Sequence, residues 1–230
     1  MPALADILAS LPTITTSTAV AGMFVTASLT ILLREWSQAL LALVIQYLLF
    51  GWLLTTLIPL PLALIKVLMG AIACVILYWS ARRAGELPTL PFEPVTPDET
   101  ARRQQAIQAA AGFPMRMPFR VVALSLAALA TYGLASRYPL PEVPPVVSLA
   151  CTWLAVAALV LLGLTESPLR TGMGLLTWLM AFEMFYVSWE RSLTIAGFLG
   201  MATLLVALGA GYLTLVRGAL LPTANGEEKS

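Results

Sequence analysis

Long apolar runs, separated by short polar or proline-bearing segments, make up most of the chain. They predict seven spanning helices, at residues 14–33, 36–57, 60–81, 119–137, 145–165, 170–189 and 192–216. Each run holds about the twenty residues that an α-helix needs to cross a bilayer. The runs lack the alternation of barrel strands, and backbone groups in lipid must bond within the protein. The pattern therefore predicts an all-α, polytopic transmembrane helix bundle.

One long polar segment, residues 82–118, divides the predicted spans into two parts. The first part is a three-helix unit at residues 1–81, and the second is a four-helix unit at residues 119–216. Within the polar segment, ELPTLPFEPVTP is too rich in proline for a helix. The Thr-Pro-Asp-Glu run at its end is a capping box, which predicts a short polar helix. We predict that residues 217–230 form a disordered tail.

The basic residues predict the orientation of the bundle. Seven spans place ten of them on one side of the membrane: Arg34, Arg82, Arg83, Arg102, Arg103, Arg116, Arg120, Arg170, Arg217 and Lys229. The other side holds only Arg137 and Arg191. Because loops rich in Lys and Arg stay in the cytoplasm, we predict a cytoplasmic C-terminus and an external N-terminus. The predicted location is the inner membrane, with the lipid bilayer as the first partner.

The composition narrows the classes of function. Hydrophobic residues make up 59% of the chain and charged residues 11%, with a net charge of +1. Soluble domains carry about 25% charged residues, and a near-neutral chain gives no reason to expect a nucleic acid partner. The chain has no histidine, and neither Cys74 nor Cys151 lies in a CxxC motif. We therefore predict no metal site, no cofactor and no catalytic cluster in this chain alone.

Glu183 is the most informative residue of the sequence. It is the only charged residue between Arg170 and Glu190, a stretch of about the length that crosses a bilayer. At such depth a charged group costs on the order of 3 kcal/mol, so it normally faces protein or water. Two interpretations remain open. Glu183 is either a proton-relay site, or a protonated packing residue that hydrogen-bonds to a neighbouring helix.

Two further polar residues lie inside predicted spans. Lys66 either compensates the charge of Glu183 or extends its ammonium group to the headgroups. Gln46, at the middle of its span, either belongs to the same relay or holds two helices together by a hydrogen bond. The candidate relay residues are therefore Glu183, Lys66 and Gln46.

Three stretches resemble the membrane component E family of hydrogenase-4-type complexes. They are QALLALVIQYLLFG, LIKVLMGAIACVILYWSARR and LRTGMGLLTWLMAFEMF, which carry Gln46, Lys66 and Glu183 respectively. Residues 145–216 also resemble the K-type small membrane subunit of respiratory complex I, which has a central Glu in its middle helix. That subunit has a second intramembrane Glu in its last helix, whereas residues 192–216 contain no carboxylate.

The resemblance implies a non-catalytic subunit in the membrane arm of a proton- or sodium-translocating oxidoreductase complex. Its partners would be other membrane subunits, in particular antiporter-like ones. Glu183 would be the relay site, with Lys66 and Gln46 as its partners. Two alternatives stay open: a structural or assembly subunit without an ion path, and a free-standing small transporter.

Overall fold

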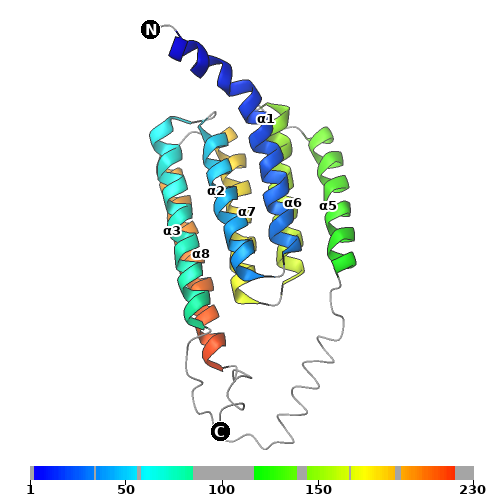
Figure 1. The fold of residues 1–230 in the computed structure, drawn as a ribbon, viewed down its shortest axis with the longest axis vertical. Coiled ribbons are helices and arrows are strands. Elements are labelled where there is room, and N and C mark those ends of the chain that lie inside the picture. Colours follow the sequence, from blue (N-terminus) through cyan, green and yellow to red (C-terminus); the bar gives the residue numbers. More distant parts are fainter. Residues whose placement is uncertain are drawn as a thin grey trace, which may run out of the picture.

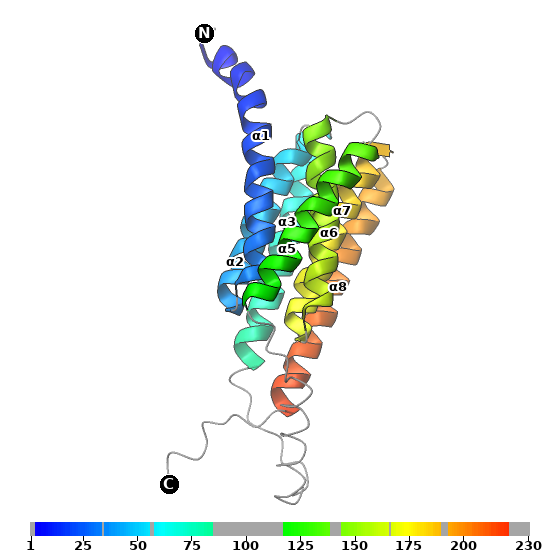
Figure 2. The ribbon, with the colours of Figure 1, turned by 90° about the vertical axis from the view of Figure 1, so that its right-hand side faces the viewer.

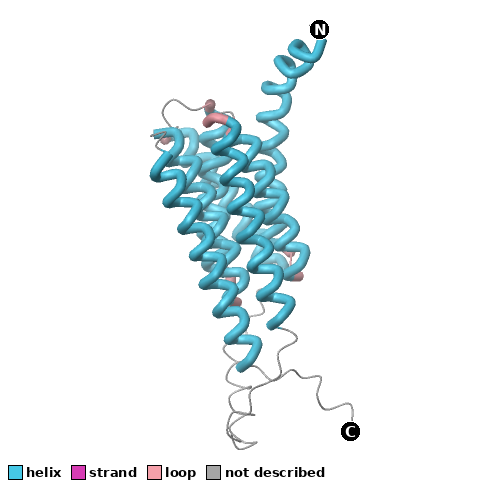
Figure 3. Tube along the Cα trace, turned by 90° about the vertical axis from the view of Figure 1, so that its left-hand side faces the viewer, coloured by secondary structure: helices cyan, strands magenta, loops and turns pink. Residues whose placement is uncertain are grey.

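The computed structural model describes residues 3–33, 35–55, 58–84, 117–138, 144–165, 167–189 and 193–220. These ranges form the helices α1 (Ala3–Leu32), α2 (Trp36–Leu54), α3 (Leu60–Ala84), α5 (Met117–Arg137), α6 (Pro145–Gly163), α7 (Pro168–Trp189) and α8 (Leu193–Leu220). No strand occurs in the described ranges (Figure 3). The all-α prediction is confirmed for this part of the chain.

Several helix boundaries differ from the prediction. The first helix begins at Ala3 rather than at residue 14, because the Ala and Leu residues before the apolar run are strong helix formers. At the other end, α8 continues to Leu220, into the segment predicted as a disordered tail. Gly218 explains this extension, because its lack of a side chain lets α8 lie against the backbone of Ala84. The prediction of a disordered tail is therefore wrong for residues 217–220.

The central polar segment is shorter than predicted on both sides. Helix α3 extends to Ala84 and α5 begins at Met117, so both helices take residues from the segment predicted at 82–118. The predicted short polar helix and the last residues of the predicted tail lie outside the described residues.

Most of these helices are suited to a membrane. Helices α2, α3, α5, α6 and α8 are long and apolar enough to cross a bilayer, and α1 contains a shorter apolar stretch at Thr16–Leu32. Many large apolar side chains are also exposed on the bundle, including Leu129, Tyr132 and Phe198. Such a surface fits lipid rather than water, because soluble monomers rarely expose large continuous apolar patches. The chain is a multi-pass membrane protein.

The bundle consists of two layers of three helices, with α5 at one edge (Figure 1). One layer holds α1, α2 and α3, and the other holds α6, α7 and α8. Across the layers, α1 packs on α6, α2 on α7 and α3 on α8. Figure 2 shows α5 beside α6, and it also touches α1. The two halves of the chain therefore pack face to face, with their helices in the same order.

Aromatic and small residues form the contact between the layers. On one side, Phe24 of α1 stacks on Trp153 of α6, with ring centroids 4.6 Å apart. On the other side, Gly211 of α8 lies against Ser80 and Ile76 of α3. Small residues let helices approach closely where no hydrophobic effect drives them together in lipid. Both mechanisms bring the inner faces of the layers into contact.

Two arginines hold the C-terminal end of α1. The Nη1 atom of Arg120 donates a hydrogen bond to the carbonyl of Ile31 at 3.2 Å, and Nη2 of Arg170 donates to that of Leu33 at 2.8 Å. The last carbonyls of a helix lack partners within it, and this end carries a partial negative charge. The arginines of α5 and α7 therefore satisfy these carbonyls and fix α1 to the second half of the chain.

The described arginines are concentrated at one end of the bundle. At the end where α3 and α8 finish lie Arg82, Arg83, Arg120, Arg170 and Arg217, whereas Arg137 lies at the opposite end. We expect a reporter fused after Leu220 to be cytoplasmic and one fused to the N-terminus to be external. Reporter activity in whole cells would show on which side each fusion lies. A reporter fused after Arg137 should also be external. Reporters that place both termini on the same side would contradict the orientation.

Candidate functional site: a buried ion pair between the layers

Lys66 of α3 and Glu183 of α7 form an ion pair inside the bundle. The two residues come from opposite layers, so the pair bridges the layers diagonally. Only 6% of Lys66 and 5% of Glu183 is exposed. The structure thus places the Lys66 ammonium group on the carboxylate and not at the end of its helix. Of the two interpretations of Lys66, this geometry matches charge compensation.

Each charge depends on the other. Removing an ion from water costs several kcal/mol even after the surroundings relax, and a partner in direct contact offsets part of that cost. The same penalty applies to the group that would remain if its partner were removed. The pair therefore fixes the relative position of α3 and α7, which contribute one charge each.

Gln46 lies beside this pair on α2. Its side chain is fully buried, and its Nε2 atom lies 3.9 Å from the sulfur of Met180 as a weak hydrogen bond. Met180 precedes Glu183 by three residues and therefore lies on the same face of α7. The structure brings Gln46 to the neighbourhood of the relay candidates, but no direct hydrogen bond joins Gln46 to Lys66 or Glu183 among the described contacts.

Sequence reasoning missed Tyr47. Its side chain is buried, and its ring lies against Gly70 of α3, one helical turn from Lys66. Tyr47 is also close enough to Glu183 and Cys74 to interact with both electrostatically. A signal was present in the sequence, because tyrosines of membrane helices usually lie at the interface and this one lies in mid-span.

The wall of the site on α8 is made of backbone. A methyl group at Gly200 would lie 3.8 Å from the Nζ atom of Lys66 and 3.6 Å from Met69. Helix α8 brings no carboxylate to this position, since residues 192–216 contain none. The cluster of Gln46, Tyr47, Lys66 and Glu183 is therefore built by α2, α3 and α7, with α8 closing one side. We call these four residues the polar cluster.

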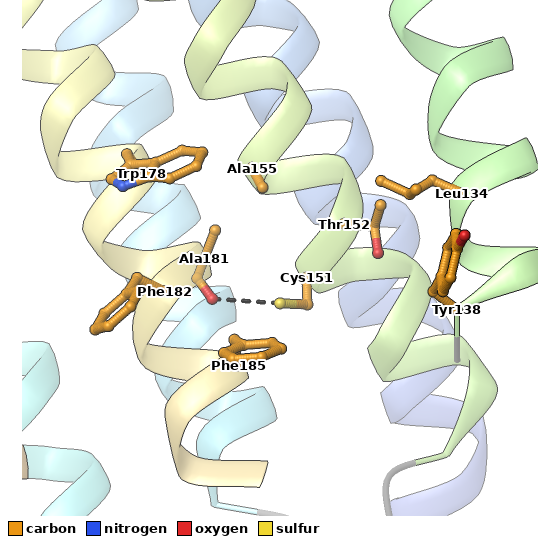
Figure 4. A pocket seen from close by; sticks show the side chains of 9 residues that line it. All are labelled: Leu134, Tyr138, Cys151, Thr152, Ala155, Trp178, Ala181, Phe182 and Phe185. Carbon is orange, nitrogen blue, oxygen red and sulfur yellow. Dashed lines mark hydrogen bonds between the residues drawn. The ribbon is translucent and has the colours of Figure 1, made fainter. Parts of the chain in front are cut away.

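A separate apolar pocket lies between α5, α6 and α7 (Figure 4). Its volume is about 320 Å³, and its lining includes Tyr138, Trp178, Phe182 and Phe185. The thiol of Cys151 donates a hydrogen bond to the carbonyl of Ala181 at 3.2 Å, which is drawn in the figure. The pocket uses a different face of α7 from Glu183. Its lining offers contacts for an apolar group and lacks a charged residue.

The ion pair predicts a non-additive effect on stability. Lys66→Met or Glu183→Leu alone should lower the free energy of unfolding by about 3–5 kcal/mol, because each leaves a buried charge unpaired. The free energy of unfolding should fall less in the double variant than in either single variant. Unfolding of the purified protein in mixed micelles, followed by tryptophan fluorescence, measures all three. Costs that simply add would contradict a coupled pair.

The contact between Tyr47 and Gly70 predicts a second effect. A methyl group at Gly70 would overlap the Tyr47 ring, so Gly70→Ala should lower the free energy of unfolding by about 1–3 kcal/mol. Gly209→Ala is the matched control, because no atom lies within 4 Å of a methyl group there. The same micelle assay compares them. Equal stabilities of the two variants would show that Tyr47 is not held against α3.

We compared the chain with protein families, with characterised proteins and with solved structures. No family model, characterised protein or solved structure matches it.

Proposed function

We propose that this chain is a non-catalytic subunit of a proton- or sodium-translocating membrane complex, and that the Lys66–Glu183 pair takes part in moving a proton. One observation carries the proposal: an ion pair buried between helices of a membrane protein. Ionisable residues inside membrane segments are costly, and they commonly mark ion pathways and proton relays. The proposal keeps all seven helices as membrane spans, in the inner membrane, with the C-terminus in the cytoplasm.

The chemistry of the pair suits a relay. As a carboxylate and an ammonium group the pair is neutral overall, whereas an added proton gives it a net positive charge. In a medium of low dielectric constant that charge interacts strongly with other charges nearby, by about 4 kcal/mol for two unit charges 4 Å apart at an effective dielectric constant of 20. A proton on Glu183 would therefore respond to charge movements in neighbouring subunits.

The polar cluster is also too small for chemistry beyond proton transfer. It combines one acid, one amine, one amide and one phenol, and an acid–base enzyme needs these groups to converge on a substrate. Redox centres would therefore belong to other subunits of the complex. The resemblance to hydrogenase-4 component E and to the K-type subunit supports this arrangement, with antiporter-like subunits as partners.

A structural or assembly subunit is the competing function. Buried ion pairs can specify which helices pack together without moving an ion. The two functions differ in what they require of Glu183. A relay needs the carboxyl to gain and lose a proton, whereas a packing role needs only that the carboxylate stays paired with Lys66.

Glu183→Gln separates these two functions, because it keeps the volume and the hydrogen-bonding capacity of the side chain but removes titration. The variant leaves the Lys66 charge without its partner, so less complex should assemble, but proton or sodium translocation per assembled complex should fall roughly a hundredfold, as it does when a positioned proton donor is lost. Uptake into inverted membrane vesicles, with a pH-sensitive dye, measures the translocation.

Glu35→Gln is the matched control, because Glu35 is exposed at the start of α2 and should be replaceable without effect. Blue-native electrophoresis checks that each variant complex is complete. Normal translocation by a fully assembled Glu183→Gln complex would refute the relay and leave the structural function.

A further inference from the structure

Two atoms of the polar cluster lack partners. The Oε1 atom of Gln46 and the hydroxyl of Tyr47 form no hydrogen bond with any described residue, although the side chains are only 0% and 5% exposed. A buried polar group without a partner destabilises the folded protein. In a membrane this cost is not relieved by bulk water. Two such groups on consecutive residues of α2 therefore call for a partner.

Most other buried hydroxyls of the described bundle bond within their own helix, although that of Thr131 has no described partner. Thr26, Thr30, Thr177 and Thr203 each donate to the carbonyl four residues earlier. This bond is a common solution for Ser and Thr in helices. The phenol of Tyr47 stands too far from its own backbone for it, and Gln46 directs its amide nitrogen to Met180. These two groups must find partners elsewhere.

Both side chains contact a residue that lies one helical turn from a charge of the ion pair. Gln46 contacts Met180, which lies one turn from Glu183 on α7. Tyr47 packs on Gly70, which lies one turn from Lys66 on α3, and it interacts electrostatically with Glu183. An acceptor, a phenolic donor and two charged groups thus converge from three helices. This is the polar environment that a buried water molecule requires, with two to four hydrogen-bonding partners.

We propose that Gln46 and Tyr47 bind internal water beside the Lys66–Glu183 pair. The Gln46 Oε1 atom accepts a hydrogen bond from the water, and the Tyr47 hydroxyl donates to it or accepts from it. Beyond these residues toward the end of α2, the buried side chains of Phe50, Leu53 and Leu54 are apolar. The water is therefore confined to the level of the polar cluster.

The binding of water is independent of the proposed function, but its use in proton transfer rests on that function. A hydronium ion formed at this position can pass its proton to the Glu183 carboxylate, which leaves neutral water and a carboxylic acid. Tyr47 and Gln46 then act as positioning residues, since they hold the water and do not change charge themselves. Gln46 thereby has a place in the relay without touching the ion pair.

Hydroxyl-radical footprinting tests the water directly. X-rays split bound water into radicals that oxidise the nearest side chains, and methionine forms its sulfoxide readily. The chain supplies an internal control, because Met180 beside Gln46 and Met173 on the same helix are 1% and 0% exposed. In the full-length chain, held in lipid nanodiscs with its co-purifying partners, Met180 should be oxidised several-fold faster than Met173.

Paired variants assign the effect to the two residues. The double variant Gln46→Leu, Tyr47→Phe removes both unpartnered groups, and Met180 oxidation should fall to the level of Met173. Tyr212→Phe is the control, because Tyr212 is 68% exposed on α8 and should leave Met180 oxidation unchanged. Mass spectrometry of peptides from graded exposures gives the rates.

Equal oxidation of Met180 and Met173 in the unaltered chain would overturn the water site, and so would fast Met180 oxidation that persists in the double variant. The footprinting involves no ion transport, so its result is separate from that of Glu183→Gln. If Met180 is oxidised no faster than Met173 and the Glu183→Gln complex is inactive, the water site is refuted and the relay is not. If Met180 is oxidised faster than Met173 and the Glu183→Gln complex is active, the relay is refuted and the water site is not.

Discussion

The cost of burying charge organises this bundle. Neither Lys66 nor Glu183 is tolerable alone among apolar side chains, so α3 and α7 must place their charges together. This requirement sets both the rotation and the height of each helix. Apolar packing gives no comparable constraint, because a lipid-facing leucine costs about the same as one against a neighbouring helix. The ion pair is therefore the interaction with the strongest demand on geometry in the described bundle.

The pair also unites the two halves of the chain. The first three helices and the last three form layers with matching order, α1 on α6, α2 on α7 and α3 on α8. The acid belongs to the second half, and its cation and neighbouring polar groups belong to the first. Residues 192–216, which include most of α8, contain no carboxylate. Here the group that interacts with the central Glu is a lysine from the other layer.

Electrostatics made part of this site predictable from sequence. A Lys and a Glu in otherwise apolar spans have strong reason to meet, and the structure brings them together. Tyr47 was not predictable in the same way, because its position follows from a close contact of α2 and α3 at Gly70. Such a contact depends on how two helices are rotated, and apolar residues on all sides leave no stripe that would set this rotation.

Helix ends also differ in whether the local sequence or a tertiary contact determines them. The Ser167-Pro168 pair precedes the predicted span, and α7 begins at Pro168. Proline is well suited to that first position, so the signal is local. The extension of α8 to Leu220 depends instead on contact between Gly218 and Ala84 of another helix. Local chemistry was enough for the first boundary, whereas the second required knowledge of the tertiary structure.

Stability alone does not account for the polar cluster. Replacing a buried ion pair by apolar side chains of similar size is often neutral or stabilising, by about 1–4 kcal/mol. The same bundle already joins its layers by apolar contacts, such as Phe24 on Trp153. At the polar cluster it instead keeps a charge pair and two unpartnered polar atoms within three neighbouring helices. Groups that are costly for folding and concentrated in one place agree with the proposed proton transfer, which apolar residues cannot perform.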